Sequence, residues 1–398
     1  MTDLKRTREI NLFRVMRSIW LNPTTSRIEI ARSLKLNRST ITQIIGEMRA
    51  IGLVKEVSVG EAGPRGGRKP IYLTINRDFG CVLGIEIQPE SYSIVAVNME
   101  GKVLDARSGA LVTTGENVVE NFVRLFGQTK SRLKNKVPPI IGVGVGLSGI
   151  VNQRQGKIVL SIPLGVSEEL PFVDRVAAKV DAPVFLDNDA KCCAWGEIAF
   201  HRSEQLRNFL FALVEFRKGR TASDPYKGIA VGLGIAIDGR VYYGRDSSAG
   251  EFRSILWRQQ NSGQFSLSDE EMLSVETDKK VRSQFVRELS KNLALFANTL
   301  NFNHVFLGGD IEKYQDEVKP VLEEEIARNW SYPNPINCEI NFSSLGPQAV
   351  AYGAAGMFLG QIFTHNYPAE TDGADELSTF QLLPEFLSRG TPYRVVRR

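Results

Sequence analysis

Apolar and polar residues follow two different patterns along the chain, and the change falls near Asn76. Before it, apolar residues recur three or four positions apart, which is the spacing of one face of a helix. After it, short apolar runs alternate with longer amphipathic segments, which indicates strands separated by helices. The pattern therefore predicts a small helical domain at the N-terminus, followed by a larger α/β body.

Helical spacing predicts three helices in the N-terminal part. The first ends near Asn22-Pro23, and its inward face carries Leu12, Val15, Met16 and Ile19. Ser26 and Glu29 have the spacing of a capping box, which starts the second helix. A tight turn over residues 35–37 leads to the third helix, whose inward face carries Ile41, Ile44, Ile45 and Met48.

Two short helices joined by a tight turn are typical of a helix-turn-helix, whose second helix enters the major groove of DNA. Strands predicted at 53–57 and 71–75 flank the stretch GEAGPRGGRKP, and this arrangement indicates a wing. Arginine on such a loop suits a minor groove. The predicted DNA contacts are polar residues of the helices and basic residues of the wing: Ser26, Arg27, Asn37, Arg38, Ser39, Thr40, Thr42, Gln43, Arg65, Arg68 and Lys69.

The distribution of charge supports nucleic acid as a partner. Residues 1–80 hold 15 Lys and Arg against 7 Asp and Glu, a net charge of +8, whereas residues 81–398 hold 34 against 38, a net charge of −4. A basic N-terminal fifth on an acidic body favours binding of double-stranded DNA. The alternatives are a solvated basic face, or a winged helix that binds protein through a loose hairpin.

The composition narrows the class of protein and its compartment. Apolar residues make up 42% and charged residues 24% of the 398 residues, as in an ordinary globular protein. Neither a long apolar run nor the apolar region of a signal peptide is found, so no membrane association is expected. The four cysteines form no C-x-x-C pair, which favours buried thiols in a reducing cytoplasm.

The body is predicted to be an α/β fold of two lobes. Strands are predicted at 81–87, 93–98, 139–146, 183–187, 209–214, 228–237 and 304–307, and helices at 116–134, 171–180, 189–199, 279–300, 314–328 and 347–363. Residues 217–228 have the composition of an exposed insertion, and the tail from Pro368 is expected to be weakly ordered.

Three polar segments of the body are candidates for chemistry, and each has a structural alternative. Asn188-Asp189 close a strand and open a helix, a favoured place for a functional carboxylate, although a helix cap explains them equally. Glycines recur at 228, 232, 234 and 239 in KGIAVGLGIAIDGRVYYG, and a hairpin at Asp238-Gly239 explains the one at 239 without any ligand. Glu251 follows a turn of small residues in SSAGE, where most glutamates are simply solvated.

Taken in the order in which they occur along the chain, segments of the N-terminal part and of the body resemble the ROK family of sugar kinases and sugar-responsive repressors. Within that family they resemble the xylose-repressor-type branch. The resemblance rests on SRIEIARSLKLNRSTITQIIGEMRAIGLVKE and GRKPIYLTIN, and in the body on IIGVGVGLSGIVN, LDNDAKCCAWGE, IAIDGRVYYG, SSAGE, HVFLGGD and GPQAVAYGAAG. It implies a winged helix-turn-helix followed by a two-lobed, actin-like ATPase body with sugar in the cleft.

The resemblance also implies domain boundaries. The winged helix-turn-helix is expected at 1–78, the first lobe at 79–190, the second lobe at 191–365 and a C-terminal tail at 366–398. The helix near 347–363 is expected to return to the first lobe.

The chain departs from the kinases of this family at both phosphate positions. Where the kinases read D-x-G-x-T, this chain reads Glu86-Ile87-Gln88-Pro89-Glu90, which adds a side chain, removes an N–H donor and places a negative charge near phosphate. Where they carry G-T-G, it has Gly228-Ile229-Ala230. The chain is therefore predicted to lack kinase activity and a nucleotide cofactor, with Asp189 at the position of the kinase base.

The family's zinc site is also missing from the sequence. The family follows A-G-E-x-G-H with a cysteine-rich run, whereas here AGE is followed by Phe252-Arg253-Ser254, and residues 250–280 contain neither Cys nor His. No metal site is predicted there, because zinc needs nitrogen or sulfur ligands.

The resemblance implies that the sugar cleft is partly retained. Gly149, Asn188, Asp189 and Glu251 match sugar contacts of the family, whereas Pro163 stands where an Asn is usual. The chain is predicted to be a homo-oligomeric repressor of carbohydrate genes that binds a palindromic operator and senses a sugar or a related effector. The alternatives are an active sugar kinase with a DNA-binding domain, and a regulator controlled by a protein partner without any sugar.

Overall fold

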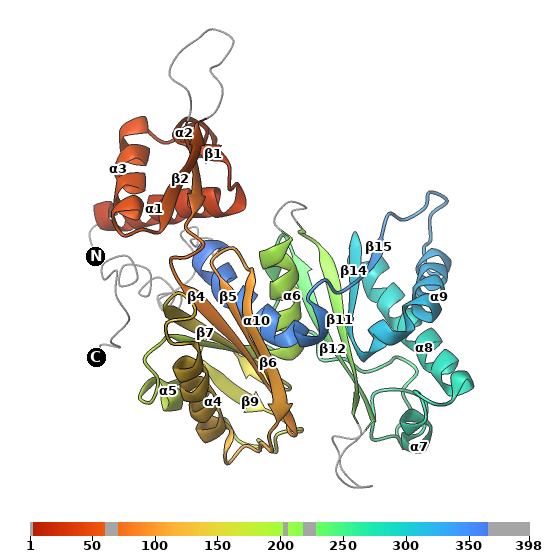
Figure 1. Ribbon diagram of the computed structural model, residues 1–398. Coiled ribbons are helices and arrows are strands. Elements are labelled where there is room, and N and C mark those ends of the chain that lie inside the picture. The colour runs from red at the N-terminus through yellow and green to blue at the C-terminus, as the bar shows by residue number, and fades with distance from the viewer. Residues whose placement is uncertain (1–2, 60–70, 202–205, 218–227, 365–398) are drawn as a thin grey trace.

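The computed structural model describes residues 3–59, 71–201, 206–217 and 228–364. A small domain of three helices and a three-stranded sheet stands on a two-lobed body (Figure 1). The predicted wing loop, the insertion and the C-terminal tail lie wholly or almost wholly outside the described residues. Among the described residues, every helix is too short or too polar to cross a membrane.

The N-terminal domain has the predicted order of helices and strands. Its elements are α1 (Asp3–Leu21), β1 (Thr25–Ser26), α2 (Arg27–Leu34), α3 (Arg38–Ala50), β2 (Val54–Val59) and β3 (Ile71–Ile75), and its antiparallel sheet has the order β1-β3-β2. All eight residues predicted on the inward faces of the first and third helices are buried. The helical spacing therefore predicted this core correctly.

The start and the end of α2 are fixed by local hydrogen bonds. Ser26 Oγ accepts from Glu29 N at 3.3 Å, and Glu29 Oε2 accepts from Ser26 N at 2.7 Å, which confirms the predicted capping box. Lys35 then adopts a left-handed conformation with φ 54°, which ends the helix and turns the chain toward α3.

The first lobe is a five-stranded mixed sheet of order β10-β7-β4-β5-β6, with an additional hairpin β8-β9. Its elements are β4 (Cys81–Ile87), β5 (Ser91–Asn98), β6 (Val103–Ala110), α4 (Val118–Leu133), β7 (Ile140–Leu147), β8 (Ile150–Asn152), β9 (Lys157–Leu160), α5 (Phe172–Ala177) and β10 (Val184–Asn188). Alternate residues of β4 face opposite sides, so that Leu83 and Ile85 pack with α4 and α5, whereas Val82 packs with α10.

The second lobe is built around another five-stranded mixed sheet, of order β13-β12-β11-β14-β15. Its elements are α6 (Asp189–Phe200), β11 (Phe209–Arg217), β12 (Gly228–Ile237), β13 (Arg240–Val241), α7 (Asp269–Leu273), α8 (Lys279–Thr299), β14 (His304–Gly309), η1 (Asp310–Tyr314), α9 (Gln315–Arg328), β15 (Glu339–Phe342) and η2 (Gly346–Gln348). The last helix, α10 (Ala349–Thr364), returns to the first lobe and packs on β4 and β7. Leu210 and Ala212 face α8 and α9, and Phe209 and Phe211 face α6.

Helices α6 and α10 lie between the two sheets, and glycines let their backbones come close (Figure 1). A Cβ on Gly84 of β4 would lie 1.8 Å from Ala351 O, and one on Gly144 of β7 would lie 1.9 Å from Ala354 O, both in α10. A Cβ on Gly353 would lie 2.2 Å from Cys192 O in α6. The two helices and the first sheet are therefore joined as one closely packed unit.

The N-terminal domain shares its hydrophobic core with this unit. The buried cluster of α1, α2 and α3 continues through Val82, Val95 and Val97 to the C-terminal half of α10. The indole of Trp20 stacks on Phe363 with ring centroids 5.1 Å apart and planes 10° apart. The domain is therefore seated on α10 by apolar packing.

Four strands of the body, β6, β8, β9 and β15, lie outside every predicted strand and hairpin. Strand β6 is an edge strand whose residues are nearly all exposed, so it lacks the apolar alternation that marks a half-buried strand. Strand β15 is short and pairs with β14 at the other sheet's edge. Helix α5 is shorter than the predicted 171–180. The domain boundaries given above stay a prediction.

We expect Gly84→Ala to lower the thermal unfolding temperature, because its methyl group would displace the backbone of α10. Overpacking of this kind costs about 1–3 kcal/mol or more of unfolding free energy. Gly127→Ala is the matched control: this glycine lies on the exposed side of α4 with open space around it, and alanine there should raise helix stability by about 0.5–1 kcal/mol. Equal effects of the two changes would contradict the packing described here.

Candidate functional site

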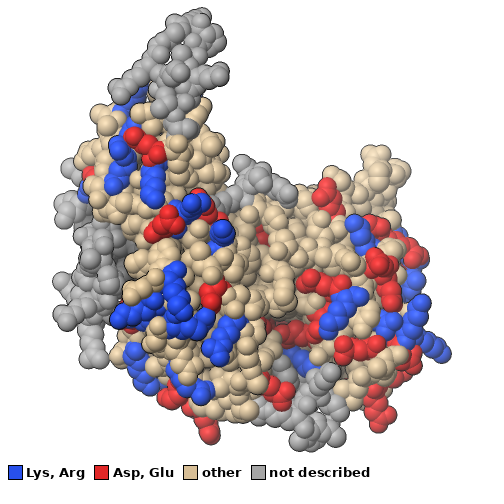
Figure 2. Space-filling view, viewed as in Figure 1, with Lys and Arg blue, Asp and Glu red and all other residues tan. Residues whose placement is uncertain are grey.

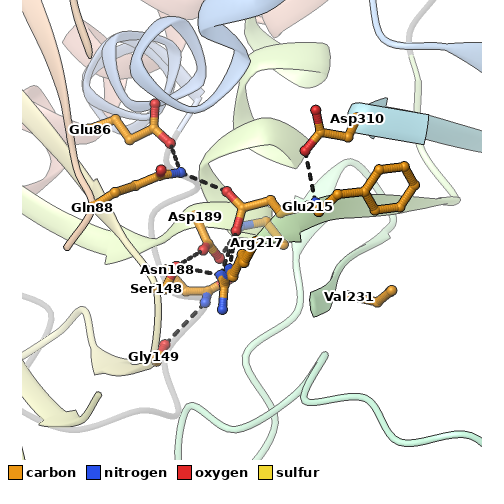
Figure 3. Close-up of polar contacts among 12 residues, drawn as sticks. Glu86, Gln88, Ser148, Gly149, Asn188, Asp189, Glu215, Arg217, Val231 and Asp310 are labelled. Atoms are coloured by element: carbon orange, nitrogen blue, oxygen red, sulfur yellow. Dashed lines mark hydrogen bonds and ion pairs between the residues drawn. The ribbon is translucent and has the colours of Figure 1, made fainter. Parts of the chain in front are cut away.

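The candidate site lies between the lobes, where the C-terminal ends of β4, β7 and β10 meet the end of β11 (Figure 3). From the first lobe come Glu86, Gln88 and Ser148, and Asp189 opens α6. From the second lobe come Glu215 and Arg217, both at the end of β11. Parallel strands place their carboxyl ends at one edge, so residues far apart in sequence converge there.

Asp189 is buried at the N-terminus of α6, and both of its carboxylate oxygens have donors. Oδ2 accepts from Ser148 Oγ at 2.5 Å, and Oδ1 accepts from Ala190 N at 2.7 Å. Burial raises the pKa of this carboxyl, while Ser148, Arg217 and the backbone N–H oppose that rise. The side chain can accept a hydrogen bond from a ligand hydroxyl, in competition with Ser148.

Asn188 and Gly149 lie against each other beside Asp189. Asn188 Nδ2 donates to Gly149 O at 3.0 Å, and Asn188 Oδ1 accepts from Lys191 N at 3.2 Å, so the side chain also caps α6. Gly149 has φ 131°, and a Cβ there would lie 2.4 Å from Leu160 O. The predicted pair is thus brought together, with Asn188 already used within the protein.

Glu251 lies on the exposed rim of the site, where its backbone bridges to Gly232 of β12. The surrounding chain still desolvates its carboxyl enough to raise its pKa, and the nearby Lys191 opposes that rise. Lys191 is only 1% exposed, and its Nζ donates to Ser247 O at 3.0 Å. This buried cation ties α6 to the turn that carries Glu251.

A second buried polar group lies behind Asp189. Tyr243 Oη donates to Asp187 Oδ2 at 2.6 Å and accepts from Trp195 Nε1 at 2.9 Å. Burial raises the pKa of Asp187 to about 6, although Lys191 and the bond from Tyr243 lower it. The sequence analysis did not find this group, because Tyr243 lies more than fifty positions from Asp187 and reads as an ordinary strand residue.

The turn between β4 and β5 carries a second set of polar residues that the sequence did not predict to interact. Gln88 Nε2 donates to Glu86 Oε1 and to Glu215 Oε1, each at 2.7 Å. Glu215 pairs in turn with Arg217, whose Nε donates to Glu215 Oε2 at 2.8 Å. Burial raises the pKa of Glu86 to about 8, and the neighbouring carboxylates of Glu215 and Asp189 add to that rise.

The backbone of this turn is also in use. Gln88 N donates to Ser91 O at 2.9 Å, and Pro89 has no N–H to donate. Pro89 O accepts from Thr113 N at 2.8 Å, and Glu90 O accepts from Leu111 N at 2.9 Å. These bonds close the hairpin on itself and onto the segment after β6.

The region predicted to lack a zinc site is filled by apolar packing and amides. Phe252 is buried against Phe265, with ring centroids 5.6 Å apart. The following turn is held by Ser254 N, which donates to Gln264 O at 2.9 Å, and by Asn292 Oδ1, which accepts from Ile255 N at 2.9 Å. Within the described part of the chain, no cluster of His, Cys, Asp and Glu has the arrangement of a metal site.

The predicted DNA contacts of α3 lie at its N-terminal end and are mostly exposed. Asn37, Arg38, Ser39, Thr42 and Gln43 are exposed, whereas Thr40 is half-buried. Among the described residues, Arg38 forms no ion pair, and Thr42 Oγ1 donates back to Arg38 O at 2.8 Å. Gln43 Nε2 donates to Glu47 at 3.3 Å. This end of α3 thus presents polar groups to solvent.

Two of the predicted contacts are engaged inside the domain. Ser26 is 4% exposed, and its hydroxyl caps α2, so that this hydroxyl has a structural use. Arg27 Nη2 pairs with Glu56 at 3.0 Å, a carboxylate that Arg49 also contacts. Arg65, Arg68 and Lys69 lie outside the described residues. Figure 2 shows Lys and Arg gathered over the N-terminal domain and the first lobe, and many Asp and Glu over the second lobe.

We expect Glu86→Gln to flatten the pH dependence of stability between about pH 5 and pH 8. The pKa of Glu86 is raised on folding, so its contribution to stability is full below its unfolded pKa and is lost as the pH rises toward 8. The amide removes this loss, and the variant should gain stability relative to the parent at pH 8 more than at pH 5. Thermal unfolding across pH measures it, with Glu90→Gln, an exposed carboxyl on the same hairpin, as the control.

Comparison with known proteins gives the same two-part organisation. Residues 8–55 match the model of a winged helix-turn-helix DNA-binding domain, and residues 82–261 match the model of the ROK family. The xylose repressor of Caldicellulosiruptor bescii is 29% identical over 248 residues, which are 61% of this chain and 58% of that protein. The chain thus matches less than two thirds of that relative's length.

Solved structures support the fold. The crystal structure of a ROK family transcriptional regulator, a homologue of the E. coli MLC protein, superposes with a TM-score of 0.74 at 20% identity and covers 96% of this chain and 99% of that chain. A ROK family glucokinase from Streptomyces griseus, solved with glucose and AMPPNP, superposes with a TM-score of 0.54 at 18% identity over 69% of this chain and 98% of that chain. The chain is therefore similar to winged helix-turn-helix DNA-binding domains over residues 8–55 and to the ROK family over residues 82–261, and it shares the fold of these solved structures.

Proposed function

We propose that this protein is a DNA-binding transcriptional regulator, a repressor of carbohydrate genes whose body senses a sugar without phosphorylating it. The observation that carries this proposal is the exposed polar end of α3 on a domain seated, through Trp20 and Phe363, on the body that holds the candidate site. Similarity to a xylose repressor supports the class of protein.

The DNA-binding part of the proposal rests on the geometry of the N-terminal domain. The short turn between α2 and α3 sets α3 as the recognition helix, with Asn37, Arg38, Ser39 and Gln43 at its exposed start. The strands β2 and β3 lead into and out of the segment that carries Arg65, Arg68 and Lys69, which we propose as wing contacts. A homodimer would present two such helices to a palindromic operator.

The absence of kinase activity is proposed from the polar contacts at the first phosphate position. A phosphate there would need backbone N–H donors, but that of Gln88 is bonded to Ser91 O and Pro89 has none. The side chain of Gln88 lies between the carboxyls of Glu86 and Glu215, so a bulky side chain fills the position where phosphate binding needs a small residue. Both features disfavour nucleotide binding.

The charge of the site favours an uncharged sugar as the effector. Among the described residues of the site, the carboxyls of Glu86, Asp187, Asp189, Glu215 and Glu251 outnumber the basic groups, which are Lys191 and Arg217. A sugar hydroxyl donates to a carboxylate, whereas a phosphate group is repelled by it. We therefore propose Asp189 and Glu251 as acceptors for hydroxyl groups, with Gly149 and Asn188 shaping the site beside them.

Packing offers a route from the effector to the DNA-binding domain. Asp189 is the first residue of α6, and the backbone of α6 lies close to that of α10 at Gly353. At the end of α10, Phe363 stacks on Trp20 of the N-terminal domain. An effector that binds one arrangement of the lobes better than another would shift the two winged helices of a dimer relative to each other.

We expect Arg38→Ala to weaken binding of a duplex selected from a random pool and to lower the slope of log K against log salt by about one. Fluorescence anisotropy at several salt concentrations measures both quantities. Arg154→Ala, an exposed arginine on the first lobe, is the control and should change neither. An unchanged slope in Arg38→Ala would show that Arg38 of α3 does not contact DNA phosphate. Arg68→Ala tests the proposed wing contact in the same way.

We expect one or more uncharged monosaccharides to raise the thermal unfolding temperature, in a panel that includes amino sugars, sugar phosphates and ATP. A ligand at about 100 times its Kd adds about 2.7 kcal/mol, a shift of roughly 2 °C in a chain of this size. Asp189→Asn should abolish the shift, whereas Asp316→Asn, an exposed carboxyl of α9, should not.

The same panel separates the alternatives. Sugar-dependent turnover of ATP that is lost in Asp189→Asn would establish a kinase and overturn the proposed lack of enzyme activity. If no compound of the panel raises the unfolding temperature while DNA binding is intact, a regulator that a protein partner controls would be favoured.

A further inference from the structure

Two hydrogen bonds cross from one lobe to the other where the phosphates of a nucleotide would be expected. In the first, the amide of Gln88, on the first lobe, donates one hydrogen to Glu86 of the same lobe and the other to Glu215 of the second lobe, both at 2.7 Å. The amide therefore bridges the buried carboxyl of Glu86 and the partly buried carboxyl of Glu215, which belong to different lobes (Figure 3).

The second crossing bond comes from Arg217. Its Nη2 donates to Ser148 Oγ of the first lobe at 3.0 Å, while its Nε donates to Glu215 at 2.8 Å. The side chains of Arg217 and Glu215 are 12% and 14% exposed, so the pair is largely withdrawn from solvent. A guanidinium held by a carboxylate in this way has a fixed orientation toward Ser148.

Ser148 links these contacts to the proposed effector site. Its hydroxyl accepts from Arg217 and donates its one proton to Asp189 Oδ2 at 2.5 Å. A ligand hydroxyl that donates to the same oxygen competes with Ser148. The inter-lobe contacts and the proposed effector contact therefore share one hydrogen-bonded chain.

We propose that Gln88, Ser148, Glu215 and Arg217 form an inter-lobe clasp that fixes the spacing of the two lobes in the protein without nucleotide. The consequence for sensing, that a hydroxyl ligand at Asp189 loosens the clasp through Ser148, rests on the proposed function. The clasp itself does not, because the lobe spacing is defined without DNA or sugar.

The direction in which each substitution changes the distance between the lobes follows from the contacts that it removes. Without the amide of Gln88, the carboxyls of Glu86 and Glu215 both lose a donor, and the hydrogen bond that joins the lobes at this point is lost. Without the guanidinium of Arg217, Glu215 loses its counter-charge and Ser148 loses a donor. Both changes weaken the same contact from opposite lobes, which a merely local role for either residue would not do.

The experiment measures the distance between the lobes by pulsed electron paramagnetic resonance. Nitroxide labels go on exposed sites of α4 and α9, at Ser131→Cys and Glu323→Cys, with Cys338→Ser removing the one native cysteine that is not fully buried. We expect one narrow distance population in the parent and a second, longer one in Gln88→Leu and in Arg217→Leu. Gln155→Leu and Arg154→Leu, which change exposed side chains on the first lobe, are the matched controls.

A rescue variant separates the clasp from a general loss of packing. Adding Glu86→Gln to Gln88→Leu replaces one of the two facing carboxyls by an amide that can donate to Glu215, and it should reduce the longer population. If Gln88→Leu fails to fold, Gln88→Asn replaces it, because the shorter side chain keeps the amide but loses its reach. Distance distributions unchanged from the parent in both Gln88 and Arg217 variants would overturn the clasp. Failure of the parent to bind DNA would overturn the proposed function and leave this result standing.

Discussion

Helix α10 lies on strands β4 and β7 backbone against backbone, because Gly84 and Gly144 place no side chain between them. The same helix meets α6 at Gly353, and its C-terminal end holds the N-terminal domain through the stack of Phe363 on Trp20. Close-packed interfaces of this kind move as units and do not deform gradually. The position of the winged helix relative to the body thus depends on an interface that three glycines make possible.

The second constraint is the number of carboxyls that the body buries between its lobes. Burial raises the pKa of Glu86, Asp187, Asp189 and Glu215, so each carboxyl needs a donor or a cation nearby. Most of those partners come from other elements: Tyr243 and Lys191 for Asp187, Ser148 for Asp189, and Gln88 for Glu215, whereas Arg217 lies beside Glu215 on β11. The site is consequently held by contacts that span the chain, and each one ties a charge to the relative position of two elements.

The sequence predicted the features that depend on the spacing of neighbouring residues. It did not predict the contacts that bring together residues far apart in the chain. Ser26 and Glu29 are three residues apart, and the capping box that they form follows from that spacing alone. Asn188 and Asp189 were placed correctly at the start of α6, because a strand end followed by a helix is a local pattern. The role of Gln88 was missed, because its partner Glu215 lies 127 positions away. Strand β6 was missed because an exposed edge strand has no apolar alternation.

These contacts give a physical meaning to the altered turn after β4. A phosphate-binding turn needs small residues and unpaired N–H groups, and the side chain of Gln88 with Pro89 removes both. The same side chain, however, supplies two donors at the point where the lobes face each other, and Glu215 and Arg217 complete the contact from the second lobe. In the proposed clasp, these side chains of the protein itself define the spacing of the lobes. For the proposed regulator, whose N-terminal domain stands on α10, a defined spacing of the lobes is the condition that lets a ligand change that spacing.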